Sequence, residues 1–250
     1  MNVHLGTIIL LTCLITFTMG AILFVVARSN PPQIKGVKEW AWSCVIQGIA
    51  WLLMTGRGQI PDFFSIVVAN TLLIAVTTMQ FQSILRFKER RHYGYKLFIP
   101  SIILFLLLNY FVYFRISGFI FGTVITLVGM TFCFLSGFFL ILRQRHPIIF
   151  SEWILSSVFI LIGIILLLKI GHILIFNSAN VYVVSGGQIQ GLFFSLICIA
   201  DILLTFSFAL MLNERFKEEI LRLAKIDPLT EVYNRAAMEQ LYKNELRRAK

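Results

Sequence analysis

Seven stretches of this chain are apolar over the length that a transmembrane helix needs. About twenty helical residues cross the ~30 Å hydrocarbon layer of a bilayer. The stretches are Leu5–Ala27, Val37–Thr55, Phe63–Leu85, Lys96–Phe114, Gly118–Leu142, Ile148–Ile175 and Gly187–Leu212. Because lipid offers no partner to backbone N–H and C=O groups, single apolar segments of this length cross it as helices. The sequence therefore predicts an all-α membrane protein with seven transmembrane helices.

Composition supports this fold class. Hydrophobic residues make up 58% of the chain and charged residues only 14%, a balance that water-soluble domains of this size do not show. The net charge of +10 raises the possibility of nucleic-acid binding. The basic residues are, however, spread over short loops beside the apolar stretches, where anionic lipid head groups suffice as partners. We therefore expect a lipid bilayer as partner and no nucleic acid. The four cysteines lie inside apolar stretches without metal-ligand spacing, so we expect no metal site.

The loop charges predict the orientation. Alternate loops on one side hold ten basic residues: Arg28, Lys35, Lys38, Arg86, Lys88, Arg90, Arg91, Lys96, Arg143 and Arg145. The loops on the other side hold only Arg57 and Arg115. Since positive loops stay in the cytoplasm, the N-terminus is expected outside and the C-terminus in the cytoplasm. Seven crossings lead to the same result.

A charged helix is expected to continue the last apolar stretch. In "LNERFKEEILRLAKID", the residues Leu212, Phe216, Ile220 and Leu223 share one helical face. Such a face lies against the membrane, or it pairs with a second copy in a short coiled coil. The pattern does not choose between these two arrangements.

Residues 224–236 carry a spaced motif. In "AKIDPLTEVYNRA", the pattern A-x-x-D-x-L-T-x-x-x-N-R is formed by Ala224, Asp227, Leu229, Thr230, Asn234 and Arg235. This segment resembles the opening of GGDEF domains, the diguanylate cyclases that condense two GTP molecules into cyclic di-GMP. Glu231 and Ala236 depart from the pattern, since the family often has Gly and a second Arg there. Pro228 disfavours a helix on its N-terminal side, and Asn234 is suited to cap a helix that begins at Arg235.

The resemblance implies an α/β output domain in the cytoplasm that acts as a dimer on GTP with Mg²⁺ or Mn²⁺. The matched residues occupy structural positions, so no catalytic residue and no metal ligand is carried over to this chain. The family's GG(D/E)EF turn lies further on than Lys250, so we expect the chain to be part of a longer protein and inactive by itself. We expect a sensor domain at 1–212, a stalk helix at 213–226 and the start of a GGDEF domain at 227–250.

The membrane part is similar to the seven-helix sensor modules found ahead of GGDEF domains. The similarity lies in "WAWSCVIQGIAWLLMTGRGQIPDFFSIVVANTLL", at Trp40, Gly48, Trp51, Arg57, Gly58, Pro61, Asp62, Ser65, Asn70 and Leu72. From the residues alone, Gly56, Gly58 and Pro61 form a turn. Trp40 and Trp42 are expected to anchor helices at the inner interface.

Ionisable residues inside the spans mark a candidate binding site, because charge is costly in lipid. Lys169 and His172 share a face near the outer end of the sixth stretch, and Asp201 lies near the middle of the seventh. Grouped with Arg57, Asp62 and Asn70, they suggest an outward-opening pocket for a small-molecule or membrane-borne ligand. The alternative is that Lys169 and His172 reach the outer surface and Asp201 accepts an interhelical hydrogen bond. Interhelical hydrogen bonds are also expected for Gln47, Gln80 and Asn109.

The function expected from these features is a transmembrane sensor that controls a diguanylate cyclase domain. The alternative is a non-enzymatic seven-helix receptor or scaffold that signals through its stalk to a partner protein. A retinal photoreceptor fits poorly because the intramembrane lysine lies on the sixth stretch instead of the last. A transporter fits poorly because the sequence shows no internal repeat.

Overall fold

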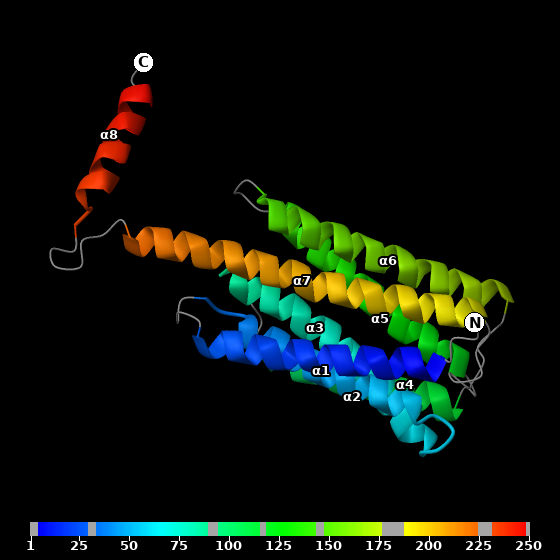
Figure 1. Cartoon of the computed structure of the whole chain (residues 1–250). Helices are drawn as coiled ribbons and strands as arrows, with labels where there is room; N and C mark the ends of the chain where they lie inside the picture. The colour runs from blue at the N-terminus through cyan, green and yellow to red at the C-terminus, as the bar shows by residue number, and fades with distance from the viewer. Residues whose placement is uncertain are drawn as a thin grey trace.

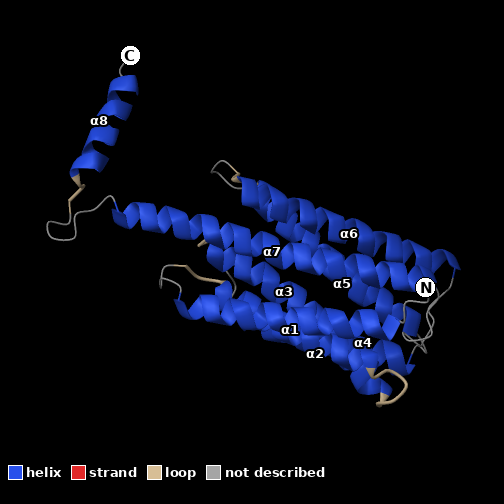
Figure 2. Ribbon diagram, in the orientation of Figure 1, coloured by secondary structure: helices blue, strands red, loops and turns tan. Residues whose placement is uncertain are grey.

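The computed structural model describes residues 5–29, 34–89, 95–115, 119–143, 148–176, 188–224 and 232–248, and every regular element in this part is helical (Figure 2). The elements are α1 (Leu5–Ser29), α2 (Val37–Thr55), the π-helix η1 (Phe63–Val68), α3 (Ala69–Phe87), α4 (Tyr95–Arg115), α5 (Phe119–Leu142), α6 (Phe150–Phe176), α7 (Gln188–Ala224) and α8 (Arg235–Arg248). Each predicted apolar stretch corresponds to one long helix, with η1 and α3 forming the third.

The helices α1 to α7 lie side by side in an up-and-down bundle (Figure 1). α2 packs between α1 and α3, α5 between α3 and α6, and α7 between α6 and α1, so these six helices form a closed ring. α4 packs on α3 and α5 from outside the ring. Most side chains on the outer surface are large and apolar, as expected of a surface that faces lipid.

Five helical stretches of the described residues are long and apolar enough to cross a membrane: Gly6–Ser29, Phe63–Phe87, Phe121–Leu142, Phe150–Phe176 and Ile189–Ile220. A multi-pass membrane protein is therefore indicated. α2 is less apolar because Lys38 and Glu39 lie in its first turn. The apolar helix Ile99–Arg115 within α4 is shorter than the other five. Seven crossings remain a prediction.

Trp40 lies in the first turn of α2, and its side chain points into the bundle. Its ring is fully buried and stacks on Phe208 of α7, with 4.0 Å between ring centroids and 7° between the planes. Phe87 meets the same Phe208 ring edge-on at 5.8 Å. The Trp40 ring therefore packs between helices, and its role as an anchor at the inner interface stays a prediction. Trp42 is half exposed, because two residues along a helix turn the side chain to another face.

Gly36 fixes the approach to α2. Its φ of 96° is left-handed, and its carbonyl oxygen accepts a hydrogen bond of 2.7 Å from Ser83 Oγ of α3. A Cβ at this position would lie 2.4 Å from the Ser83 carbonyl oxygen. Only glycine fits between the turn and α3.

Ionic side chains tie the helices together at the end of the bundle from which α7 leaves. Arg86 of α3 pairs with Glu39 of α2, and Ser151 of α6 donates to Glu214 of α7. Lys88, directly after α3, pairs with Glu152 of α6 at 2.7 Å, with side chains only 8% and 11% exposed. The part of α7 around Glu214, where the helix leaves the bundle, is thus held in a network that includes α2, α3 and α6.

α7 is a single helix of 37 residues, or roughly 55 Å at 1.5 Å per residue. Its C-terminal part projects beyond the ends of its neighbours (Figure 1). Leu212 is buried, Phe216 packs on the core of the bundle, and Ile220 is 64% exposed. The predicted apolar face is therefore divided between the bundle and the surface.

The predicted cap of the next helix is confirmed. α8 begins at Arg235, and Asn234 Oδ1 accepts a hydrogen bond of 2.9 Å from the backbone N–H of Ala237. Asp227, Leu229 and Thr230 lie outside the described residues.

The predicted orientation has a direct test. Gln59, in the turn after α2, and Ser29, at the end of α1, are both exposed and lie at opposite ends of the bundle. In a variant without native cysteines, a membrane-impermeant maleimide added to intact cells is expected to label Gln59→Cys and not Ser29→Cys. The reverse pattern would contradict the orientation predicted from the loop charges.

Candidate functional site

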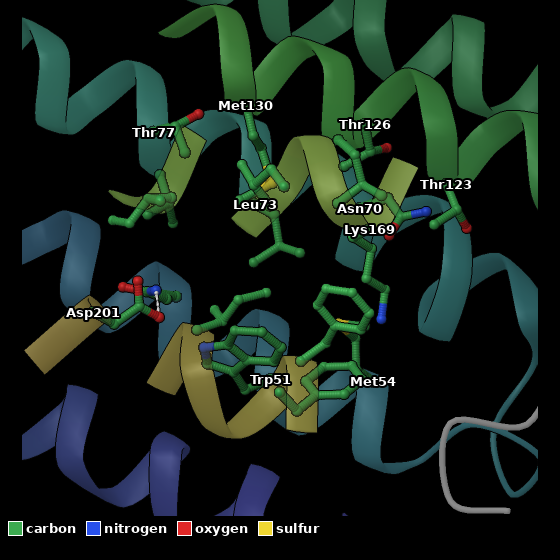
Figure 3. Close-up of a pocket in the computed structure, with 18 of the residues that line it drawn as sticks. Trp51, Met54, Asn70, Leu73, Thr77, Thr123, Thr126, Met130, Lys169 and Asp201 are labelled. Carbon is green, nitrogen blue, oxygen red and sulfur yellow. Dashed lines mark hydrogen bonds between the residues drawn. The ribbon is translucent and has the colours of Figure 1, made fainter. Parts of the chain in front are cut away.

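A cavity of about 120 Å³ lies inside the ring, lined by α2, α3, α5, α6 and α7 (Figure 3). An engineered apolar cavity of about 150 Å³ in another protein admits benzene, and the volume of this one approaches that value. Most of its lining is apolar, and a few polar groups converge on it. Such a combination is typical of small-molecule sites.

The cavity brings together residues that are distant in sequence. Five of the six candidate residues line it: Arg57, Asn70, Lys169, His172 and Asp201. The sixth, Asp62, is not among the lining residues, and its carboxylate accepts a hydrogen bond of 2.7 Å from Tyr113 of α4. Asp62 therefore acts on the site only through its charge, which affects Arg57, and as part of the turn after α2.

Arg57 lies in the turn between α2 and η1 and lines the cavity. Its Nη2 donates a hydrogen bond of 3.0 Å to the carbonyl oxygen of Ser65 in η1. A π-helical turn departs from the α-helical hydrogen-bond pattern, and such turns are frequent at functional sites. Burial lowers the pKa of Arg57 to about 10, and the charge of Asp62 opposes that shift. Arg57 is therefore still a cation at neutral pH.

Lys169 is a partly buried cation surrounded by aromatic rings. Its Nζ lies 5.1 Å from the ring centroid of Phe193 and 5.0 Å from that of Phe194, both on α7. The His172 ring lies 5.0 Å from that of Phe176. Among the described residues no carboxylate forms an ion pair with Lys169. Lys169 thus faces the interior, where each cation–π contact stabilises it by about 0.5–2 kcal/mol.

Asp201 accepts a hydrogen bond of 2.7 Å from Gln47 Nε2 of α2. The interhelical hydrogen bonds expected for Asp201 and Gln47 are therefore confirmed, and both residues also line the cavity. The bond expected for Asn109 is confirmed as well, since its Oδ1 accepts from Thr126 of α5 at 3.3 Å.

In the part of the chain that the structure describes, buried polar atoms of lining residues without a hydrogen-bond partner include Trp51 Nε1, Asn70 Nδ2 and Gln80 Oε1. Their residues are 5%, 5% and 2% exposed. A buried polar group without a partner costs about 1–3 kcal/mol, so these atoms are suited to bind a ligand. Neither Trp51 nor Gln80 was among the candidate residues. The polar row of Asn70, Thr77 and Gln80, seven and three residues apart on one helical face, is the sequence signal that could have identified Gln80.

The polar groups are divided between two ends of the cavity. Figure 3 shows Lys169, Asn70 and Thr123 on one side and Asp201 on the other. Lys169 is level with Phe193 and Phe194, and Asp201 follows them on α7 by seven or eight residues, or roughly 11 Å. The basic side chain of Lys169 thus lies at one end of the cavity and the carboxyl group of Asp201 at the other.

Among the residues that the structure describes, no group of three or more His, Cys, Asp or Glu side chains is arranged to hold a metal ion. No protein-family model, curated protein or solved structure matches the chain.

Proposed function

We propose that this protein is a seven-helix sensor of the bacterial inner membrane that binds a small ligand in the cavity and controls a cytoplasmic diguanylate cyclase domain. The N-terminus lies outside and the C-terminus in the cytoplasm. The cyclase domain uses GTP with Mg²⁺ or Mn²⁺. Its opening is the motif at Asp227, Leu229, Thr230, Asn234 and Arg235.

The observation that carries this proposal is the course of α7. Phe193, Phe194 and Asp201 line the cavity, and the same uninterrupted helix continues to Ala224, three residues before Asp227. A ligand that moves α7 therefore moves the segment that carries the cyclase motif.

A ligand changes the balance between two arrangements of the bundle only if it binds one of them more tightly than the other. The ion pair of Lys88 with Glu152 and the hydrogen bond from Ser151 to Glu214 lie where α7 leaves the bundle. We propose that one arrangement keeps these contacts and the other changes them as α7 shifts or rotates.

We further propose a homodimer, because the family's product is made by two domains that meet face to face. The exposed Ile220, on the face that begins at the buried Leu212, supports contact with a second copy through the part of α7 outside the bundle.

The proposal predicts that output depends on the rotational phase of α7. In the full-length protein, two residues inserted after Glu219 rotate everything that follows by about 200°, whereas seven rotate it by only about 20°. Cyclic di-GMP synthesis from GTP and Mg²⁺ in nanodiscs is expected to change at least tenfold, or to lose its regulation, with two residues. With seven inserted residues, cyclic di-GMP synthesis is expected to stay near that of the parent protein.

Two outcomes would contradict the proposal. Equal output from both insertions would exclude transmission through α7. An absence of cyclic di-GMP under every condition would instead favour the receptor that signals through its stalk to a partner protein.

A further inference from the structure

We propose that the cavity binds a small organic anion with an apolar body, and that the negatively charged group of this ligand pairs with Lys169. This inference rests on the proposed sensor function and names the chemical class of its ligand. Three observations support it: the charges around the cavity, a buried donor, and the shape of the lining.

Among the residues that the structure describes, the charge of Lys169 has no carboxylate as ion-pair partner. Among the described lining residues, the Lys and Arg side chains are those of Lys169 and Arg57, and the carboxyl side chain is that of Asp201. Asp201 already accepts from Gln47, and it lies roughly 11 Å deeper than Lys169. Arg57 donates to the Ser65 carbonyl oxygen. Lys169 contacts aromatic rings, which compensate a desolvated cation less well than an anion does.

An unused hydrogen-bond donor lies on the same side. In the described part of the structure, Asn70 Nδ2 is a buried donor without a partner, and Asn70 lies beside Lys169 in Figure 3. Trp51 Nε1 is a second such donor, and its ring meets Phe194, which Lys169 also contacts, but the nitrogen is at the end of the ring toward Asp201 (Figure 3). A donor and a cation together suit a group that only accepts hydrogen bonds, such as a carboxylate.

The rest of the cavity favours an organic ligand over an inorganic anion. Leu73 lies between the Lys169 end and the Asp201 end in Figure 3, and Met54 and Phe194 add further apolar lining. An inorganic anion would leave this apolar space unfilled, whereas the body of an aromatic or aliphatic acid fills it. The Asp201 end offers a carboxyl group and the Lys169 end a cation, so the ligand's negatively charged group lies at the Lys169 end.

Matched pairs of acids and amides test the proposal. Benzoate and benzamide, and phenylacetate and phenylacetamide, are nearly equal in shape and differ in charge. Binding to the full-length protein in nanodiscs is measured by tryptophan fluorescence and by thermal unfolding, with sodium sulfate as the inorganic control. At least one acid is expected to bind tenfold or more tightly than its amide, because a charge-assisted hydrogen bond is lost in the amide.

Lys169→Met removes the charge and keeps much of the side-chain volume, and it is expected to reduce this preference for the acid at least tenfold. Lys169→Arg keeps the charge and is expected to retain the preference. Arg115→Met is the matched control, since Arg115 is an exposed cation at the same end of the bundle and does not line the cavity. It is expected to leave binding unchanged.

The proposal is wrong if the amides bind as tightly as the acids, if neither binds, or if Lys169→Met keeps the full preference. Equal effects of sulfate and the organic acids would also overturn it. These measurements on binding do not depend on cyclase activity. Regulated cyclic di-GMP synthesis without anion binding would therefore refute only the ligand class, and anion binding without any synthesis would refute only the cyclase function.

Discussion

Gly36→Ala is expected to destabilise the bundle by about 3 kcal/mol, since an alanine in the left-handed region costs about 1–2 kcal/mol before any clash is counted. The added Cβ would lie 2.4 Å from the Ser83 carbonyl oxygen, which belongs to the backbone of α3 and does not move aside easily. Relief of the clash would separate the start of α2 from α3 and stretch the hydrogen bond from Ser83 Oγ to the Gly36 carbonyl oxygen. Reversible unfolding in mixed micelles measures the loss.

Gly171→Ala is the matched control. Gly171 lies within α6, and a Cβ there would meet nothing within 4 Å. This substitution is expected to be neutral or to stabilise the protein by up to about 1 kcal/mol, because alanine favours the helix. Similar losses for the two variants would show that the turn at Gly36 does not have the role assigned to it.

Lys88→Met is expected to cost about 3 kcal/mol, because it leaves the Glu152 carboxylate with less compensation in a buried position. The two side chains are 8% and 11% exposed and join the end of α3 to the first turn of α6. A surface pair of the same geometry would contribute only about 0–1 kcal/mol.

A double-mutant cycle separates this pair from general damage to the bundle. Lys88→Met combined with Glu152→Gln is expected to lose at least about 1 kcal/mol less than the two single substitutions added together. Arg215→Met is the control, because Arg215 forms an exposed pair with Glu218 and is expected to cost less than about 1 kcal/mol. Additive losses at Lys88 and Glu152 would contradict a direct coupling between them.

The helices themselves follow closely from the sequence. Val37–Thr55 was predicted and is observed without change as α2, and the prediction of Phe63–Leu85 differs by two residues from the end of α3 at Phe87. Apolar length and the turn residues Gly56 and Pro61 suffice for these limits. The π-helix η1 was not predicted, since hydrophobic periodicity does not distinguish one extra residue in a turn.

The candidate site follows from the sequence only in part. The cost of charge in lipid pointed to Lys169 and Asp201, and both line the cavity. From the sequence, Trp51 was identified only as part of the family resemblance, and Gln80 was expected only to form an interhelical hydrogen bond. Each has a buried polar atom without a partner, a property that exists only once the neighbouring helices are in place.

The sequence alone determined that the chain forms long apolar helices with charge concentrated in one set of loops, because helix length and hydropathy are local properties. The tertiary structure decided that six of these helices close into a ring and that Trp40 turns to the centre of it. It also decided that Lys169 and Asp201 lie at opposite ends of one cavity. Such positions depend on the rotation and depth at which each helix packs, which result from contacts between side chains distant in sequence.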